Sequence, residues 1–250
     1  MFYLEIGGVF ILGLIFGSFL NLVSYRLIRQ QSILFPHSYC DSCQEPLSWF
    51  DLIPVFGYLS TKGKCRHCGK LIAWHYPLIE ILLGLLWAML FWRFGFSWYT
   101  LGGLIFSFLL LVCALTDGDS GMIFNRVTYP GILLGLLFSL LQGKIALAFG
   151  GMLLLGVAFG LVLLLSRGGM GGGDLKMALM IGAFCGTQGA FLTFVLSSLS
   201  GFIYVVYLFL RRRAKRKLEI RFGIFLSGGS YLAYLYGTEL LELYLSILAR

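Results

Sequence analysis

Long apolar segments are the feature that most limits what this chain can fold into. They contain no alternation of apolar and polar residues that would indicate strands, and most approach the roughly 20 residues that a helix needs to cross a bilayer. Charged residues make up 12% of the chain, about half the share of a soluble domain. We therefore expect an all-α polytopic membrane protein with about eight transmembrane helices. The segments are 4–25, 77–92, 99–116, 127–142, 145–165, 175–192, 194–210 and 223–248.

The distribution of basic residues predicts the orientation of these helices. The first apolar segment has no basic residue before it and is followed by Arg26 and Arg29, which is typical of a retained helix rather than a cleaved signal peptide. Loops rich in Lys and Arg stay in the cytoplasm, so we expect the N-terminus outside. The run RRRAKRK at 211–217 is then a loop beside anionic lipid headgroups, and no nucleic-acid partner is expected. Most Lys and Arg residues fall in or beside four stretches, 26–76, 117–126, 166–174 and 211–222.

The long polar stretch at 29–76 holds four cysteines in two C-x2-C pairs, Cys40 with Cys43 and Cys65 with Cys68. Two such pairs complete the tetrahedral shell of one zinc ion, and a closed four-ligand site is structural rather than catalytic. Cytoplasmic thiols stay reduced, which disfavours disulfides. We therefore predict a cytoplasmic, zinc-ribbon-like tetracysteine loop between the first two transmembrane helices. Unmetallated or redox-active cysteines are the alternative.

Two aspartates lie at the predicted cytoplasmic edge of the membrane. Asp117 ends one apolar segment in ALTDGDSGMIF, and Asp174 opens another in GGMGGGDLKM. An ionisable side chain at membrane depth is costly and indicates function, although Asp174 alone would also serve as a helix N-cap and Asp117 as a solvated loop residue. Two carboxyls that share a site do not both ionise easily, so one keeps a proton while the other activates water. The pair favours hydrolysis of a peptide bond without a covalent intermediate.

Helix dipoles suggest which aspartate is the base. A helix C-terminus disfavours the anion of Asp117, whereas a helix N-terminus favours that of Asp174. We expect Asp174 to be the base and Asp117 the acid, within a titration that belongs to the pair. Glycines such as Gly171 and Gly173 would let a substrate backbone approach closely and leave the loop free to move. Lys176 adjoins this loop at the membrane edge.

Two other acidic residues compete for functional roles. Asp119 follows Asp117 by two residues and is expected to face water. Glu80 lies in YPLIE, one turn into the second predicted helix, where it would bind a ligand or pair with a lysine.

These motifs together resemble the bacterial prepilin peptidases, also called the type IV leader peptidase family, which are GxGD-type membrane aspartic proteases. The resemblance covers nearly the whole chain and implies that Asp117 and Asp174 are the catalytic pair. It also implies an N-terminal helix pair with the tetracysteine domain at 1–98 and a peptidase domain at 99–250. The segments that carry it are GSFLNLVSYRL at 17–27, the cysteine pairs with YPLIE, Asp117, the Gly171-Gly172-Gly173-Asp174 run, and RFGIFLSGG at 221–229.

The resemblance implies two activities at the cytoplasmic face of the bacterial plasma membrane. The first is cleavage, after a glycine, of the basic leader of type IV prepilins or type II secretion pseudopilins. The second is methylation of the new N-terminal residue with S-adenosylmethionine, although the residues themselves show no glycine-rich nucleotide loop. One departure is Phe124-Asn125, where the family usually has Pro-Asp, and we expect it to alter loop geometry or substrate preference.

Other functions are open at this point. In a peptidase without methyltransferase activity, the cysteine domain would be structural or would dock the substrate. A proton- or ion-coupled transporter would use Asp117 and Asp174 as ligands, although such carboxylates usually lie near the bilayer midplane in broken helices. A membrane-tethered zinc ribbon that contacts nucleic acid would not need the remaining helices. The sequence leaves the oligomeric state and the individual substrate open.

Overall fold

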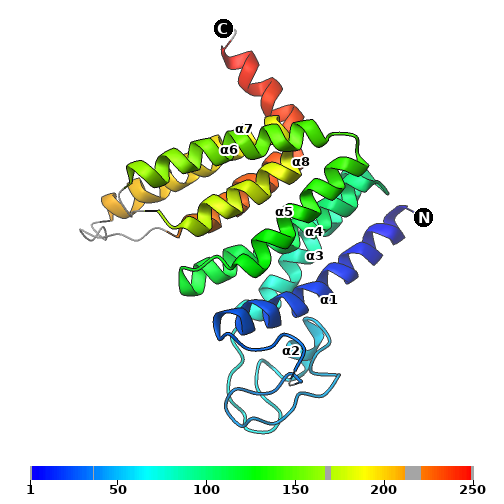
Figure 1. The fold of residues 1–250 in the computed structure, drawn as a ribbon. Coiled ribbons are helices and arrows are strands. Elements are labelled where there is room, and N and C mark those ends of the chain that lie inside the picture. Colours follow the sequence, from blue (N-terminus) through cyan, green and yellow to red (C-terminus); the bar gives the residue numbers. More distant parts are fainter. Residues whose placement is uncertain (1, 36, 167–169, 212–220, 249–250) are drawn as a thin grey trace. The chain divides into compact units, whose positions relative to one another are not determined.

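The computed structural model describes residues 2–35, 37–166, 170–211 and 221–248, and its named elements are all helices (Figure 1). This confirms the all-α fold class. Five of the described helices are long and apolar enough to cross a membrane, namely α1, α3, α4, α6 and α7, and the shorter α5 is also apolar. The protein is therefore a multi-pass membrane protein. The basic run at 211–217 lies outside the described residues, apart from Arg211.

The chain divides into two compact units, Met1–Phe96 and Ser97–Arg250. Unit 1 contains α1 (Phe2–Ile28), the short α2 (Phe56–Ser60) and α3 (His75–Phe94). Unit 2 contains the other five helices, α4 (Trp98–Ser120), α5 (Asn125–Leu141), α6 (Ile145–Leu165), α7 (Gly172–Leu210) and α8 (Phe222–Leu248).

Glycines allow α1 and α3 to pack backbone against backbone in unit 1. A Cβ on Gly13 would lie 2.6 Å from the Cα of Gly84, and a Cβ on Gly17 would lie 2.6 Å from the Cα of Glu80. Lipid tails are as apolar as leucine, so membrane helices associate through such close contacts and through hydrogen bonds. The glycine contacts fix the register of the two helices, and they place Glu80 one turn into α3.

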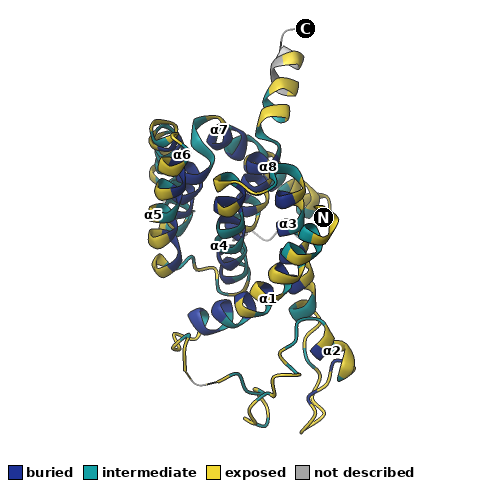
Figure 2. Ribbon diagram, turned by 90° about the vertical axis from the view of Figure 1, so that its right-hand side faces the viewer, coloured by how far each residue is buried: buried dark blue, intermediate teal, exposed yellow. Residues whose placement is uncertain are grey.

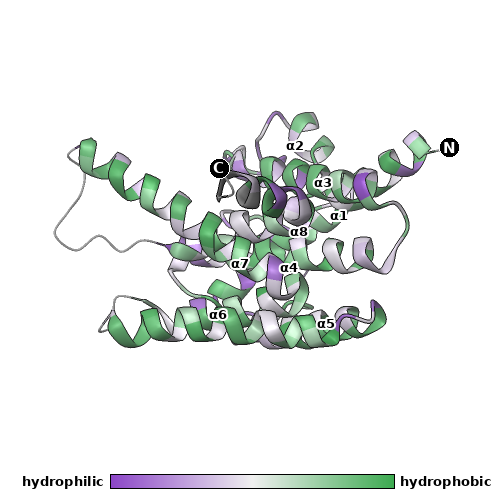
Figure 3. Ribbon diagram, turned by 90° about the horizontal axis from the view of Figure 1, so that it is seen from above, coloured by the Kyte–Doolittle hydropathy of each residue, from purple (hydrophilic) through white to green (hydrophobic). Residues whose placement is uncertain are grey.

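Buried hydroxyl groups link the helices of unit 2 across an apolar interior. Ser139 of α5 donates to the carbonyl of Ala183 in α7 at 2.7 Å, and Ser227 of α8 donates to the carbonyl of Leu110 in α4 at 3.0 Å. Buried residues occupy the helix faces that meet (Figure 2). Apolar residues also cover outward faces of α5 and α6 (Figure 3); Leu153, for example, is 69% exposed. Such faces suit contact with lipid.

The 39-residue α7 is interrupted at Gly186, whose φ of 64° and ψ of −173° are not helical. The contacts between α6 and α7 show that the chain reverses there. Residues of α7 before Gly186 contact successively earlier residues of α6, whereas residues after Gly186 contact successively later ones. In the order of α7, the pairs are Leu179 with Gly156, Gly182 with Gly151, Thr187 with Leu147 and Phe194 with Phe159. Thus α7 consists of two antiparallel helices joined by a tight turn.

The turn at Gly186 lies seven residues before the division expected between 192 and 194. Both halves of α7 are apolar, so hydropathy does not mark the turn, whereas the backbone conformation at Gly186 is essentially restricted to glycine. The first half, 172–185, is about 21 Å long at 1.5 Å per residue. It is therefore shorter than the roughly 30 Å hydrocarbon core of a bilayer.

We expect Gly186→Ala to destabilise the protein by about 1–3 kcal/mol, because a Cβ makes this conformation strained. Gly160→Ala, in a helical stretch of α6 with no atom within 4 Å of the added carbon, should be neutral or stabilising by up to about 1 kcal/mol. Thermal unfolding of both variants in detergent micelles measures the difference. Equal unfolding temperatures would contradict the turn assigned to Gly186.

Candidate active site and metal centre

Asp117 lies in the last turn of α4, which ends because Gly121 adopts the left-handed conformation at φ 69°. The N–H of Gly121 donates to the main-chain carbonyl of Asp117 at 2.8 Å. The carboxyl group of Asp117 is buried, and its Oδ2 accepts a hydrogen bond from the N–H of Gly223 at 2.9 Å. Gly223 is in the first turn of α8, so the end of α4 and the start of α8 meet at this side chain.

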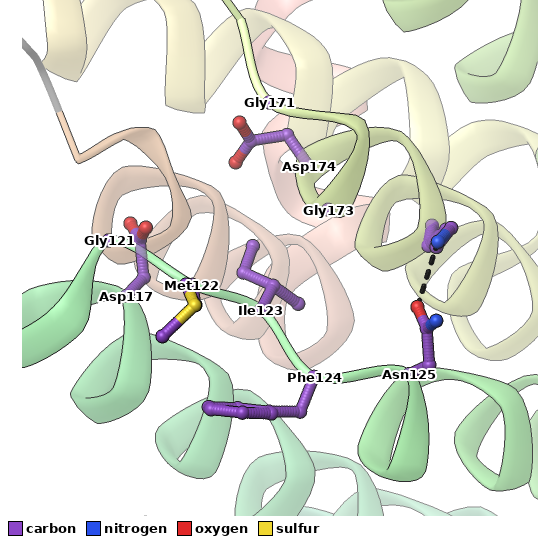
Figure 4. Close-up of a pocket in the computed structure, with 10 residues that line it drawn as sticks. Asp117, Gly121, Met122, Ile123, Phe124, Asn125, Gly171, Gly173 and Asp174 are labelled. Atoms are coloured by element: carbon purple, nitrogen blue, oxygen red, sulfur yellow. Dashed lines mark hydrogen bonds between the residues drawn. The ribbon is translucent and has the colours of Figure 1, made fainter. Parts of the chain in front are cut away.

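Asp174 lies in the first turn of α7 and faces the same cavity as Asp117 (Figure 4). Its Oδ1 is buried and has no hydrogen-bond partner among the described residues. The cavity has a volume of about 400 Å³, within the range of small ligand sites. Its walls include the α4–α5 loop at 121–125 and the start of α7. The fold thus brings together two carboxyl groups that lie 57 positions apart in the sequence.

The structure weakens the use of helix dipoles to assign Asp117 as the acid and Asp174 as the base. Asp117 does sit at the C-terminal end of α4, as the sequence indicated. Its carboxylate, however, also accepts an N–H at the N-terminal end of α8, where the helix dipole stabilises negative charge. Helix dipoles therefore do not distinguish Asp117 from Asp174.

The glycines before Asp174 have different surroundings. A Cβ on Gly173 would lie 2.9 Å from the Cβ of Ile123 in the α4–α5 loop, whereas a Cβ on Gly172 would meet no atom within 4 Å. Gly171 is exposed and lines the cavity. Gly173 thus lets α7 pack against the α4–α5 loop, and Gly171 is the better candidate for contact with a substrate.

Lys176 also lines the cavity and donates to the Oδ1 of Asn125 at 2.8 Å. Its ammonium group lies 5.6 Å from the centre of the Tyr129 ring. Asn125 therefore keeps a polar contact at the position where the family usually has an aspartate, but it does not neutralise Lys176. A positive charge consequently stands at the rim of the cavity that both aspartates face.

Sequence reasoning missed the contacts of Gly223 and Ile123. Gly223 falls in the RFGIFLSGG segment that carried the family resemblance, and the loop contact of Ile123 leaves no trace in composition. The two competing acidic residues lie elsewhere: Asp119 is exposed, as expected, and Glu80 belongs to unit 1, where it accepts the N–H of Val55 at 2.6 Å.

The four loop cysteines form a candidate metal site in unit 1. Their sulfur atoms all lie within 4.8 Å of one another, and the separations are 3.9 Å both for Cys40–Cys68 and for Cys43–Cys65. A disulfide requires about 2.05 Å, whereas four sulfurs at 2.3 Å from a tetrahedral zinc ion lie about 3.8 Å apart. The cluster therefore fits a metal ion with one ligand from each cysteine.

The two cysteine pairs sit in equivalent turns. Each first cysteine donates its N–H to the carbonyl five residues later and accepts the N–H of the residue four positions later. That fourth residue has a positive φ in both turns, 60° at Gln44 and 72° at Gly69. In the first turn, backbone N–H groups of Cys43 and Ser42 lower the pKa of the Cys40 thiol to about 6, whereas burial and the neighbouring thiols raise the pKa of Cys43 to about 12, as is expected when several thiols share one site.

Both the part of the chain with the cysteine cluster and the part with the two aspartates match known protein families. Residues 11–94 match the bacterial Peptidase A24 N-terminal domain, and residues 104–206 match the type IV leader peptidase family. A Bacillus subtilis relative named prepilin leader peptidase/N-methyltransferase is 34% identical, over 96% of this chain and 97% of its own. The chain belongs to the type IV leader peptidase family.

Two further relatives have the same name. The protein of Aeromonas salmonicida is 31% identical over 95% of this chain and 93% of its own. That of Pseudomonas aeruginosa is 32% identical over 94% and 91%. No solved structure matches the chain. The full-length matches confirm the resemblance that the sequence motifs indicated.

We expect Gly173→Ala to cost about 1–3 kcal/mol of stability, because the added carbon forces Ile123 and its loop to shift. Gly172→Ala is the matched control, one residue away and with open space around it, and should keep or slightly raise stability. Chemical denaturation in detergent compares the two variants. If both behave alike, Gly173 does not pack against the α4–α5 loop as described.

Proposed function

We propose that this protein cleaves the leader from type IV prepilins or pseudopilins, with Asp117 and Asp174 as the catalytic pair. The observation that carries the proposal is the shared cavity: the two carboxyl groups come from different helices and face one space. The full-length relatives named prepilin leader peptidase/N-methyltransferase supply the substrate class. Prepilins are thus the proposed partners.

The reaction is hydrolysis by water between the two aspartates. Asp174, as the ionised base, removes a proton from water in the cavity that both aspartates line. The water oxygen attacks the scissile carbonyl, and the protonated Asp117 donates its proton to the carbonyl oxygen. Collapse of the tetrahedral intermediate breaks the C–N bond as the nitrogen takes up a proton.

The cavity lies at the cytoplasmic side of the membrane in this proposal, with the N-terminus of the protein outside. The excess of basic residues in the intervening loops supports this orientation. The first half of α7 is shorter than the bilayer core, so its Asp174 end lies below the membrane surface if its Gly186 end reaches the other surface. Such a depth suits a bond between a basic leader and an apolar pilin helix.

A second activity follows from the names of the relatives. We propose that the protein also methylates the new N-terminus of the pilin, with S-adenosylmethionine as the methyl donor. Unit 1 matches a separate N-terminal domain of the family, and its tetracysteine cluster would bind zinc. The ion would cross-link two turns of the loop and contribute to folding rather than to chemistry.

We expect Asp117→Asn and Asp174→Asn each to reduce leader cleavage at least 1,000-fold, because either change removes a proton-transferring carboxyl group. Asp119→Asn is the matched control, since Asp119 lies in the same turn but is exposed; it should cleave within about twofold of the wild type. Co-expression with a prepilin, followed by electrophoresis, measures the cleaved fraction.

Expression and thermal unfolding of each variant show whether it is folded. If folded Asp117→Asn and Asp174→Asn proteins both cleave normally, the catalytic pair is wrong and a transporter becomes the better hypothesis.

The zinc proposal predicts one metal ion per chain, lost from the variant in which all four loop cysteines are serine. Cys185→Ala is the control, because Cys185 lies in α7 of unit 2, and it should keep the ion. Elemental analysis of purified protein measures zinc. We expect the quadruple variant to keep leader cleavage and to lose methylation; an unchanged zinc content would show that the cysteines do not bind it.

A further inference from the structure

Unit 1 contains its own cavity of about 400 Å³, lined by the C-terminal half of α1, the loop that carries the cysteines and the start of α3. We infer that this cavity binds S-adenosylmethionine, with the sulfonium group next to Glu80. The inference rests on the proposed methyltransferase function, and it adds the location of the methyl donor and the residue that recognises its charge.

Glu80 is the main reason for placing a cation here. Its side chain is 8% exposed, and its carboxylate accepts hydrogen bonds from the N–H of Val55 and from Ser18. No lysine or arginine forms a salt bridge with it in the described part of the chain; the pair that occurs in this domain is Arg66 with Asp51. The ionised form of a carboxyl group is unfavourable when it is buried without a cation, so a positively charged ligand would stabilise the charged form of Glu80.

The loop opposite Glu80 is held in a strained conformation. Val55 has a φ of 61°, which is a genuine outlier for a β-branched residue, and its N–H points to the Glu80 carboxylate. Two residues later, Gly57 packs so closely on the backbone of Asp51 that no side chain would fit. Strain of this kind persists where the surrounding structure fixes it, and it clusters at ligand sites. Here it shapes the cavity wall that faces Glu80.

The remainder of the lining matches the other parts of the methyl donor. Tyr25 donates to the carboxylate of Asp41 at 2.6 Å, and Asp41 can also accept hydrogen bonds from ribose hydroxyls. Lys64 and Lys70 also line the cavity and suit the α-carboxylate of the methionine part. The cavity thus presents charges of both signs, as a zwitterionic ligand with an additional sulfonium charge requires.

The metal site adjoins this cavity without facing the reacting atoms. Cys40 and Cys65 are among its lining residues, so the ion would hold the cavity wall in place. In the transfer itself, the uncharged N-terminal amine of the cleaved pilin attacks the methyl carbon. The C–S bond breaks with its electron pair going to sulfur, which leaves neutral S-adenosylhomocysteine, and the methylated ammonium releases a proton to water.

Charge recognition can be tested with a pair of ligands and a pair of variants. Equilibrium dialysis of the full-length protein in detergent measures the Kd of S-adenosylmethionine and of S-adenosylhomocysteine, which lacks the sulfonium charge. For Glu80→Gln, we expect the Kd of S-adenosylmethionine to rise at least tenfold and that of S-adenosylhomocysteine to change less than threefold. Glu45→Gln removes the same charge from an exposed residue outside the cavity lining and should change neither.

A second measurement does not depend on the folding of Glu80→Gln. Ultraviolet cross-linking of radiolabelled S-adenosylmethionine to the wild-type protein, followed by peptide mapping, should label peptides within residues 18–80. Label confined to unit 2 would overturn the inference, and so would equal effects of Glu80→Gln on the Kd of both ligands. Methylation by the wild-type protein would in either case leave the proposed function standing. A wild-type protein that cleaves prepilin but neither binds the donor nor methylates would instead refute the methyltransferase function itself.

Discussion

Backbone contact between Gly151 of α6 and Gly182 of α7 sets the position of the first half of α7. A Cβ on either residue would lie about 2.5 Å from backbone atoms of the other helix, so the two backbones touch without intervening side chains. Close packing of this kind replaces the hydrophobic effect as the force between helices in lipid. Together with the reversal at Gly186, this contact fixes the register of α7 along α6, and hence the position of Asp174 at the start of α7.

Backbone contacts likewise hold Asp117. Gly121 ends α4 one turn after it, and Gly223 brings the start of α8 close enough to donate an N–H to its carboxylate. A side chain on Gly223 would come within 2.8 Å of that carboxylate. Both aspartates are therefore positioned by rigid helix ends and glycine contacts, an arrangement that suits the proposed catalytic pair.

Unit 1 is held together differently, because its long loop has few buried apolar residues that could stabilise it by packing. The paired cysteine turns bring four sulfurs together, and Glu80 of α3 anchors the strained turn at Val55. A bound metal would add its binding free energy to the stability of the folded loop and would hold the cavity wall in place. The same buried carboxylate that anchors the loop provides the negative charge from which we infer the methyl-donor site.

The sequence by itself determined the helical class, the spacing of the four loop cysteines and the identity of the two aspartates at the ends of apolar segments. Each of these is a local property: hydropathy over about 20 residues, a C-x2-C turn, or a charge beside an apolar run. Only the tertiary structure decided that α7 reverses at Gly186, that Gly173 packs against Ile123 and that Gly223 contacts Asp117. These features depend on which backbones meet. In the sequence, a glycine that allows a close contact between helices cannot be distinguished from one that only ends a helix. Whether Glu80 has a cationic partner is likewise decided by packing, because the residues that line its cavity come from α1, the cysteine loop and α3.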